Sequence, residues 1–142
     1  MKTLLTLSVL FLAINFCKAQ TPKWILCSVY SNGSKSLLVS EVADVTLLPK
    51  TGVNRIGAYG KLNLIDFYSK VAKKWFEDLL RSNGYTGLSQ EINVVIKSPD
   101  INNINCASGN ENGCFISKDD IQEIRKETIN LNAPQRQIIY IK

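Results

Sequence analysis

The chain has 142 residues, of which 45% are hydrophobic and 20% charged, and its formal net charge is +5. This length and balance indicate one small globular domain and exclude a coiled coil, a collagen and a polar disordered chain. Because the sequence contains no histidine, Ser-His-Asp and Cys-His catalysis, histidine general bases and His-containing zinc sites are also excluded.

Residues 1–19 have the pattern of a cleavable signal peptide. An early lysine precedes an apolar stretch at 4–16, and Cys17 and Ala19 place small side chains at the −3 and −1 positions. The apolar stretch is too short to span about 30 Å of hydrocarbon as a helix. We therefore expect a secreted or periplasmic domain over residues 20–142, with no transmembrane segment. Lipidation of Cys17, and retention of the stretch as a buried helix or an anchor, are the alternatives.

Two runs rich in branched and aromatic residues, at 23–31 and 36–48, predict a β-hairpin. The Asn32-Gly33 pair between them favours a type I′ turn, because both residues tolerate positive φ. If this pair is the whole loop, Ser31 faces Ser34. The same register pairs residues further from the turn, namely Leu26 with Val39 and Trp24 with Glu41.

Apolar residues recur every three to four positions between 64 and 80, which predicts one amphipathic helix. Asn63 is the expected N-cap, and Gly84 is expected just beyond the C-cap. Trp75 and Phe76 lie on the apolar stripe, so we expect both at the centre of the core. The opposite face predicts ion pairs one turn apart, namely Lys73–Glu77, Lys74–Asp78 and Glu77–Arg81.

The last third of the chain adds two strands and a helix. Alternating apolar residues predict a strand over 91–97, and a second strand is expected at 137–141. Between them, Ser117 and Asp120 predict a capping box that begins a helix ending at about Thr128. Two flanking residues, Ile116 and Ile121, fit a hydrophobic staple.

The resulting order, β-β-α-β-α-β, indicates an α+β fold in a single small domain. We expect one four-stranded mixed sheet with the long amphipathic helix packed on it.

The candidate binding surface is the Asn-rich loop at 98–116 with the start of the helix that follows it, through the hydrogen-bonding side chains Asn105, Asn110, Asn112 and Asp119. Residues 108–119 also resemble a twelve-residue calcium loop, with Gly113 at its sixth position. The first position is Ser, the last is Asp instead of Glu, and no incoming helix precedes the loop. We therefore favour a surface loop and assign no metal or cofactor.

Three cysteines lie beyond the leader. In an oxidising compartment we expect a Cys106–Cys114 disulfide that closes the Asn-rich loop, with Cys27 left as a free thiol in the first strand. The alternative is three reduced cysteines, with Cys27 a small core residue.

Other residues that could take part in catalysis or phosphate binding are better explained by structural roles. Ser69 and Lys73 lie one turn apart on a charged helix face, and the adjacent acids at 77–78 and 119–120 point about 100° apart. The glycines at 57 and 60 match neither a Walker loop nor a dinucleotide fingerprint. Lysines of the long helix alternate with acids, so we expect no nucleic-acid partner.

These patterns favour a small exported binding or interaction module without an evident catalytic site, whose partner is a protein or a small molecule. The alternative is an envelope or extracellular enzyme, or an enzyme inhibitor, that acts through carboxylates or through the 98–116 loop. An apolar pocket containing a carboxylate of perturbed pKa favours an enzyme, whereas a protruding loop without a pocket favours a binder or inhibitor.

Overall fold

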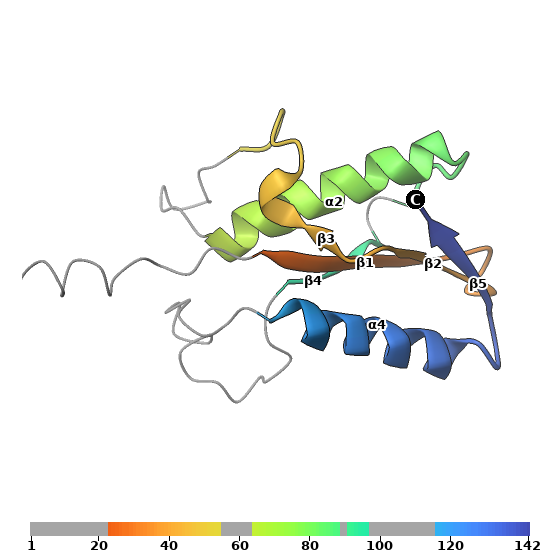
Figure 1. Cartoon of the computed structure of the whole chain (residues 1–142). Helices are drawn as coiled ribbons and strands as arrows, with labels where there is room; N and C mark the ends of the chain where they lie inside the picture. The colour runs from red at the N-terminus through yellow and green to blue at the C-terminus, as the bar shows by residue number, and fades with distance from the viewer. Residues whose placement is uncertain (1–22, 55–63, 89–90, 97–115) are drawn as a thin grey trace, which may run out of the picture.

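We describe residues 23–54, 64–88, 91–96 and 116–142 of a computed structural model. Their elements are β1 (Trp24–Ser31), β2 (Ser36–Ser40), β3 (Ala43–Asp44), η1 (Val45–Leu47), α2 (Leu64–Ser82), β4 (Asn93–Val95), α4 (Lys118–Asn132) and β5 (Gln137–Ile141). A mixed sheet lies between α2 on one face and α4 on the other (Figure 1). The predicted α+β class is confirmed.

Pairing in the sheet places β1 and β2 at its centre. β1 pairs antiparallel with β2 and with β4, and β2 pairs parallel with β5. The four main strands therefore follow the order β4-β1-β2-β5, with β3 as a short addition to β1. Only the long helix was expected on this sheet, but α4 covers the second face. Burial on both faces explains why β1 and β2 read as continuous apolar runs.

The predicted hairpin exists, but its predicted register is wrong by two residues. Ser31 pairs with Ser36, so the loop holds four residues and not two. Asn32, Gly33 and Ser34 all have positive φ, at 56°, 61° and 66°. The left-handed backbone thus continues one residue beyond the Asn-Gly pair. A two-residue shift changes cross-strand partners and leaves every side chain on its face, because the strand period is two.

The predicted second strand, 36–48, is interrupted. β2 ends at Ser40, and β3 then pairs with β1 at a register offset by one residue, as at a β-bulge. Beyond β3 the Asp44 carboxylate accepts hydrogen bonds from the Thr46 backbone N–H (3.0 Å) and from the Thr46 hydroxyl (2.6 Å). This local capping favours the η1 turn over a longer strand.

The bounds of α2 agree with the sequence pattern, and so does its C-terminal signal. Gly84 has a φ of 85°, and its N–H donates to the Arg81 carbonyl at 3.0 Å. The next N–H, of Tyr85, donates to the Leu80 carbonyl at 2.9 Å. These two bonds form a Schellman motif, which satisfies carbonyls that the helix leaves unpaired. The proposed N-cap, Asn63, lies outside the described residues.

Two aromatic residues of α2 were predicted to lie at the centre of the core, and the structure confirms this position for one of them. Phe76 is fully buried, and it packs with Ile25, Cys27 and Val29 of β1. Trp75 is only partly buried, so its predicted central position is wrong. Consecutive residues of a helix point about 100° apart, so Phe76 faces the sheet while Trp75 lies at the edge of the apolar stripe.

On the other face, α4 begins as predicted. The Ser117 hydroxyl accepts a hydrogen bond from the Asp120 N–H at 3.1 Å, and the Asp120 carboxylate accepts from the Ser117 N–H at 3.2 Å. Ile116 and Ile121, the predicted staple, are buried in one cluster with Leu26 of β1. The helix runs past Thr128 to Asn132, and β4 is shorter than the predicted 91–97 strand. Neither of the two described helices is long and apolar enough to cross a membrane.

Candidate functional site

Most of the predicted site residues lie outside the described part of the chain. These are Asn105, Asn110, Asn112, Cys106 and Cys114, so the binding loop, its calcium alternative and its disulfide stay predictions. Asp119 is described, and it is exposed in the first turn of α4, beside the capping box. In the described residues we find no group of three or more Cys, Asp or Glu side chains that could hold a metal.

The described residues contain a different candidate, a pocket between α2 and the loop that follows η1. Its volume is about 250 Å³. The loop contributes Pro49 and Thr51, and the helix contributes Lys74, Trp75, Asp78, Leu79 and Ser82. We call this site the Trp75 pocket. It joins an aromatic and aliphatic wall to an ammonium, a carboxylate and two hydroxyls.

The loop side of the Trp75 pocket is held by hydrogen bonds and by the core. The Lys50 ammonium donates to the carbonyls of Thr46 (2.6 Å) and Leu48 (3.2 Å). Leu48 and Val53 pack against the main core cluster, which anchors the loop at both ends. Between them Gly52 has a φ of 76°, and a Cβ at that position would lie 3.8 Å from Cε of Lys74. The loop backbone therefore lies against the stem of Lys74.

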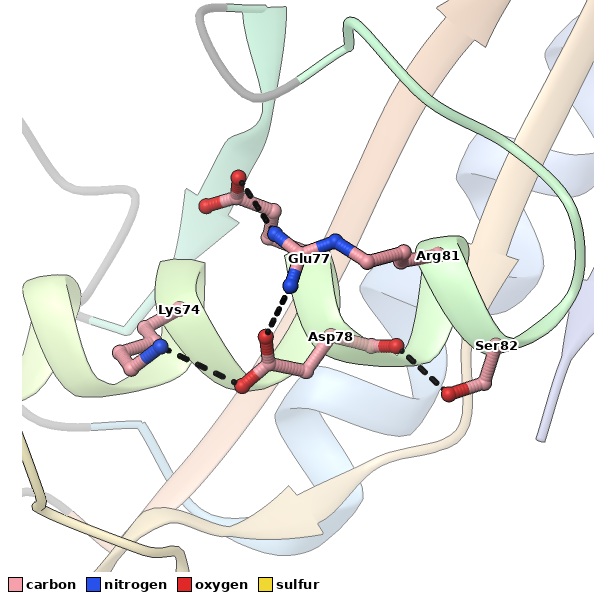
Figure 2. Close-up of polar contacts among 5 residues, drawn as sticks. All are labelled: Lys74, Glu77, Asp78, Arg81 and Ser82. Atoms are coloured by element: carbon pink, nitrogen blue, oxygen red, sulfur yellow. Dashed lines mark hydrogen bonds and ion pairs between the residues drawn. The ribbon is translucent and has the colours of Figure 1, made fainter.

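The polar side of the pocket is a chain of ion pairs on the exposed face of α2 (Figure 2). One Asp78 carboxylate oxygen lies 3.5 Å from the Lys74 ammonium, and the other lies 3.4 Å from Nη1 of Arg81. Nη2 of Arg81 also contacts Glu77 at 3.4 Å, and the Ser82 hydroxyl donates to the Asp78 carbonyl at 2.9 Å. Lys74–Asp78 and Glu77–Arg81 confirm two of the three predicted pairs.

These ion pairs orient the side chains and contribute little to stability. The Asp78 side chain is 50% exposed and its partners, Lys74 and Arg81, are 46% and 62% exposed. Pairs this exposed typically contribute about 0.2–1 kcal/mol or nothing measurable. The network therefore places the Asp78 carboxylate between two cations at the rim of the pocket, where Lys74 and Asp78 belong to the lining.

Trp75 gives the pocket a fixed wall. Its ring centroid lies 6.4 Å from that of the buried Phe76, with the planes tilted by 42°. The side chain also packs against the main cluster, so its inner part is held by the core while the rest borders the pocket. Sequence reasoning assigned Trp75 to the core and overlooked this role. One feature of the sequence could have indicated this role, namely the position of Trp75 at the border between the apolar stripe and the charged face.

Two other reactive side chains have structural roles. Cys27 is a free, fully buried thiol, as expected, and its Sγ lies 3.7 Å from the Ala72 carbonyl of α2. Burial raises the pKa of this thiol, so it stays protonated and unreactive at neutral pH. The hydrogen bond from the Ser117 hydroxyl, helped by the one from its backbone N–H, lowers the pKa of Asp120. A general acid needs a shift in the opposite direction.

The fold and the site define a small α+β domain with an open, aromatic-walled pocket on one helix. No protein-family model matches the chain, and no curated protein or solved structure gives a significant match.

Proposed function

We propose that the protein is a small secreted or periplasmic binding module that holds its ligand in the Trp75 pocket and acts without catalysis. Export rests on the leader pattern of residues 1–19. The single observation that carries binding is Trp75 itself. A large aromatic side chain, held by the core and open to a pocket, provides contact area at a low cost in conformational entropy.

The pocket's carboxylate supports recognition more than proton transfer. Both oxygens of Asp78 already contact a cation, Lys74 on one side and Arg81 on the other. Such a charge offers hydrogen-bond acceptance in a defined direction. A general acid or base more often lies in a buried environment, whereas the Asp78 side chain is 50% exposed.

A second part of the proposal concerns the 98–116 loop. We propose that a Cys106–Cys114 disulfide closes this loop after export, because disulfides form and persist in oxidising compartments and seven residues separate the two cysteines. A closed loop with Asn105, Asn110 and Asn112 would offer a second set of hydrogen-bonding side chains. An inhibitor or an enzyme that acts through this loop is the competing hypothesis.

Fluorescence of Trp75 tests the pocket directly, because the chain has only two tryptophans. In the Trp24→Phe variant, Trp75 is the sole reporter. We would titrate it with four probes: a panel of neutral methyl glycosides, tetramethylammonium, acetate and a proline-rich peptide. A saturable change in emission with at least one probe is expected.

The matched control is Trp75→Phe, in which Trp24 reports on the α4 face. Trp24 packs in the cluster with Leu26 and Ile121 and lies beneath the ammonium of Lys118, 4.9 Å from the ring centroid. Its emission should not respond to the probes. If no probe changes Trp75 emission, the pocket is not the binding site and the proposal is wrong.

A further inference from the structure

The size of the Trp75 pocket limits what it can hold. Pockets for drug-sized ligands have volumes of about 300–1,000 Å³, and this pocket has about 250 Å³. It therefore fits one ring or one side chain. Because the pocket is partly open to solvent, a larger molecule can place a single unit in it and leave the rest outside.

The charges of the pocket favour a neutral ligand. Its lining contains one cation and one anion, Lys74 and Asp78, whose charged atoms lie 3.5 Å apart. A cationic ligand beside Asp78 would be repelled by the Lys74 ammonium at one carboxylate oxygen and by Arg81 at the other. An anionic ligand beside Lys74 would meet the Asp78 carboxylate. A ligand of either charge would be attracted by one of these two side chains and repelled by the other.

A purely apolar ligand is also disfavoured. It would cover the hydroxyls of Thr51 and Ser82 together with the ammonium and carboxylate of the rim, and would offer them no hydrogen bonds. Covering polar groups without replacing their bonds to water opposes binding. The ligand must instead carry an apolar surface for Trp75 and Leu79 and hydroxyl groups for the polar rim.

We propose that the Trp75 pocket binds a neutral sugar ring of a glycan, an inference that rests on the proposed function. A pyranose has a face of C–H groups, which suits the aromatic wall, and a rim of hydroxyls. Neighbouring hydroxyls can donate to the two oxygens of Asp78 and accept from the Lys74 ammonium. The hydroxyls of Ser82 and Thr51 extend the same polar rim.

The probe panel separates sugars from other ligands. With the Trp24→Phe protein, we expect a neutral methyl glycoside to saturate at about millimolar concentration, as an open site for one ring implies. Tetramethylammonium, acetate and the proline-rich peptide should produce no saturable change. Ligand-observed NMR should show the glycoside's ring C–H protons closest to the protein.

Three variants test which side chains bind the sugar. Trp75→Leu, followed by NMR, should weaken glycoside binding by about tenfold or more, because an aromatic platform is lost. Asp78→Asn should weaken it by about threefold to tenfold, because a charged acceptor becomes a neutral amide. The matched control is Glu77→Gln, because Glu77 belongs to the same ion-pair chain but lies outside the Trp75 pocket. The glycoside affinity of this variant should stay within about twofold of that of the protein with Glu77.

The outcomes are distinguishable. Saturation by one of the other three probes but by no glycoside would overturn the sugar assignment and leave the pocket as a binding site. Saturation by none of them would overturn both proposals. Equal weakening by Asp78→Asn and Glu77→Gln would also overturn the sugar assignment, because the effect would then belong to the helix surface. Circular dichroism of each variant confirms that it is folded.

Discussion

At the scale of single residues, neighbours on α2 have different environments. Phe76 is fully buried against β1, whereas the adjacent Trp75 is shared between the core and the pocket. Their stability contributions should therefore differ, although the sequence pattern places both on the apolar stripe. Cys27 shows the same dependence on position, because its thiol is unreactive only as long as α2 covers it.

Phe76→Ala should reduce the free energy of unfolding by about 3–5 kcal/mol, since a large buried aromatic is removed and a cavity remains. Trp75→Ala should cost less, about 1–2 kcal/mol, because part of its ring is already in contact with water. Urea unfolding of both variants measures the difference. Equal losses would show that Trp75 is as deeply buried as Phe76.

Cys27 should make stability fall in alkali. Its folded pKa is raised by burial, so the folded chain keeps a proton that the unfolded chain releases above a pKa of about 8.5. The contribution of the protonated thiol to the free energy of unfolding is complete below that pKa. It is lost as the pH rises above it, by about 1.4 kcal/mol per pH unit. Denaturant unfolding between about pH 8 and 10.5 should show this slope in the native protein and lack it in Cys27→Ala. A parallel pair of curves would contradict burial of the thiol.

At the scale of elements, local hydrogen bonds set where helices and strands end. The Schellman motif at Gly84 ends α2, the Ser117 capping box begins α4, and Asp44 ends β3. Each of these signals involves residues within a few positions of one another. That proximity explains why the C-terminal end of α2 and the start of α4 were predictable from the sequence.

Gly84→Ala should reduce the free energy of unfolding by about 1–2 kcal/mol. Its φ of 85° lies in the left-handed region, which a side chain destabilises. No heavy atom lies within 4 Å of a Cβ placed there, so the cost is conformational and not steric. Gly84→Asn is the control, and its loss should be smaller, because Asn tolerates this conformation better. Thermal unfolding compares the two, and a larger loss for Asn would show that side-chain size matters.

At the scale of the whole molecule, two helices enclose a sheet whose central strands are buried on both faces. Residues of β1 alternate between the α2 cluster, through Ile25 and Val29, and the α4 cluster, through Leu26. The Trp75 pocket lies at the edge of this core, between α2 and the loop that follows η1. Its Trp75 and Leu79 also pack against the main core cluster, so the binding surface and the core share these two side chains.

Export and disulfide formation are also properties of the whole chain. Intact-mass measurement of the native protein should show that it begins at Gln20, and non-reducing peptide mapping should recover Cys106 linked to Cys114. The unlinked Cys27 should react with an alkylating reagent only after unfolding. Soluble protein that retains residues 1–19, or a bridge that contains Cys27, would contradict the proposal.

The main strands and helices, and their order along the chain, could be predicted from the sequence, whereas β3 and η1 could not. The 3.6-residue pattern of α2, the capping box at Ser117 and the glycine at position 84 act through near neighbours, so they could be read without the fold. The same reasoning located the hairpin and the final strand.

Contacts between residues that are distant in the sequence depended on how the elements pack in three dimensions. The hairpin register depended on a third left-handed residue, Ser34, which a turn motif of two residues does not contain. The division of burial between Trp75 and Phe76 depended on where β1 lies beneath α2, and the pocket depended on a loop 23 or more positions before Lys74. Such contacts are set by packing across the molecule. The local pattern places Trp75 at the border of the apolar stripe, but packing decides that the sheet covers Phe76 and leaves Trp75 beside the pocket.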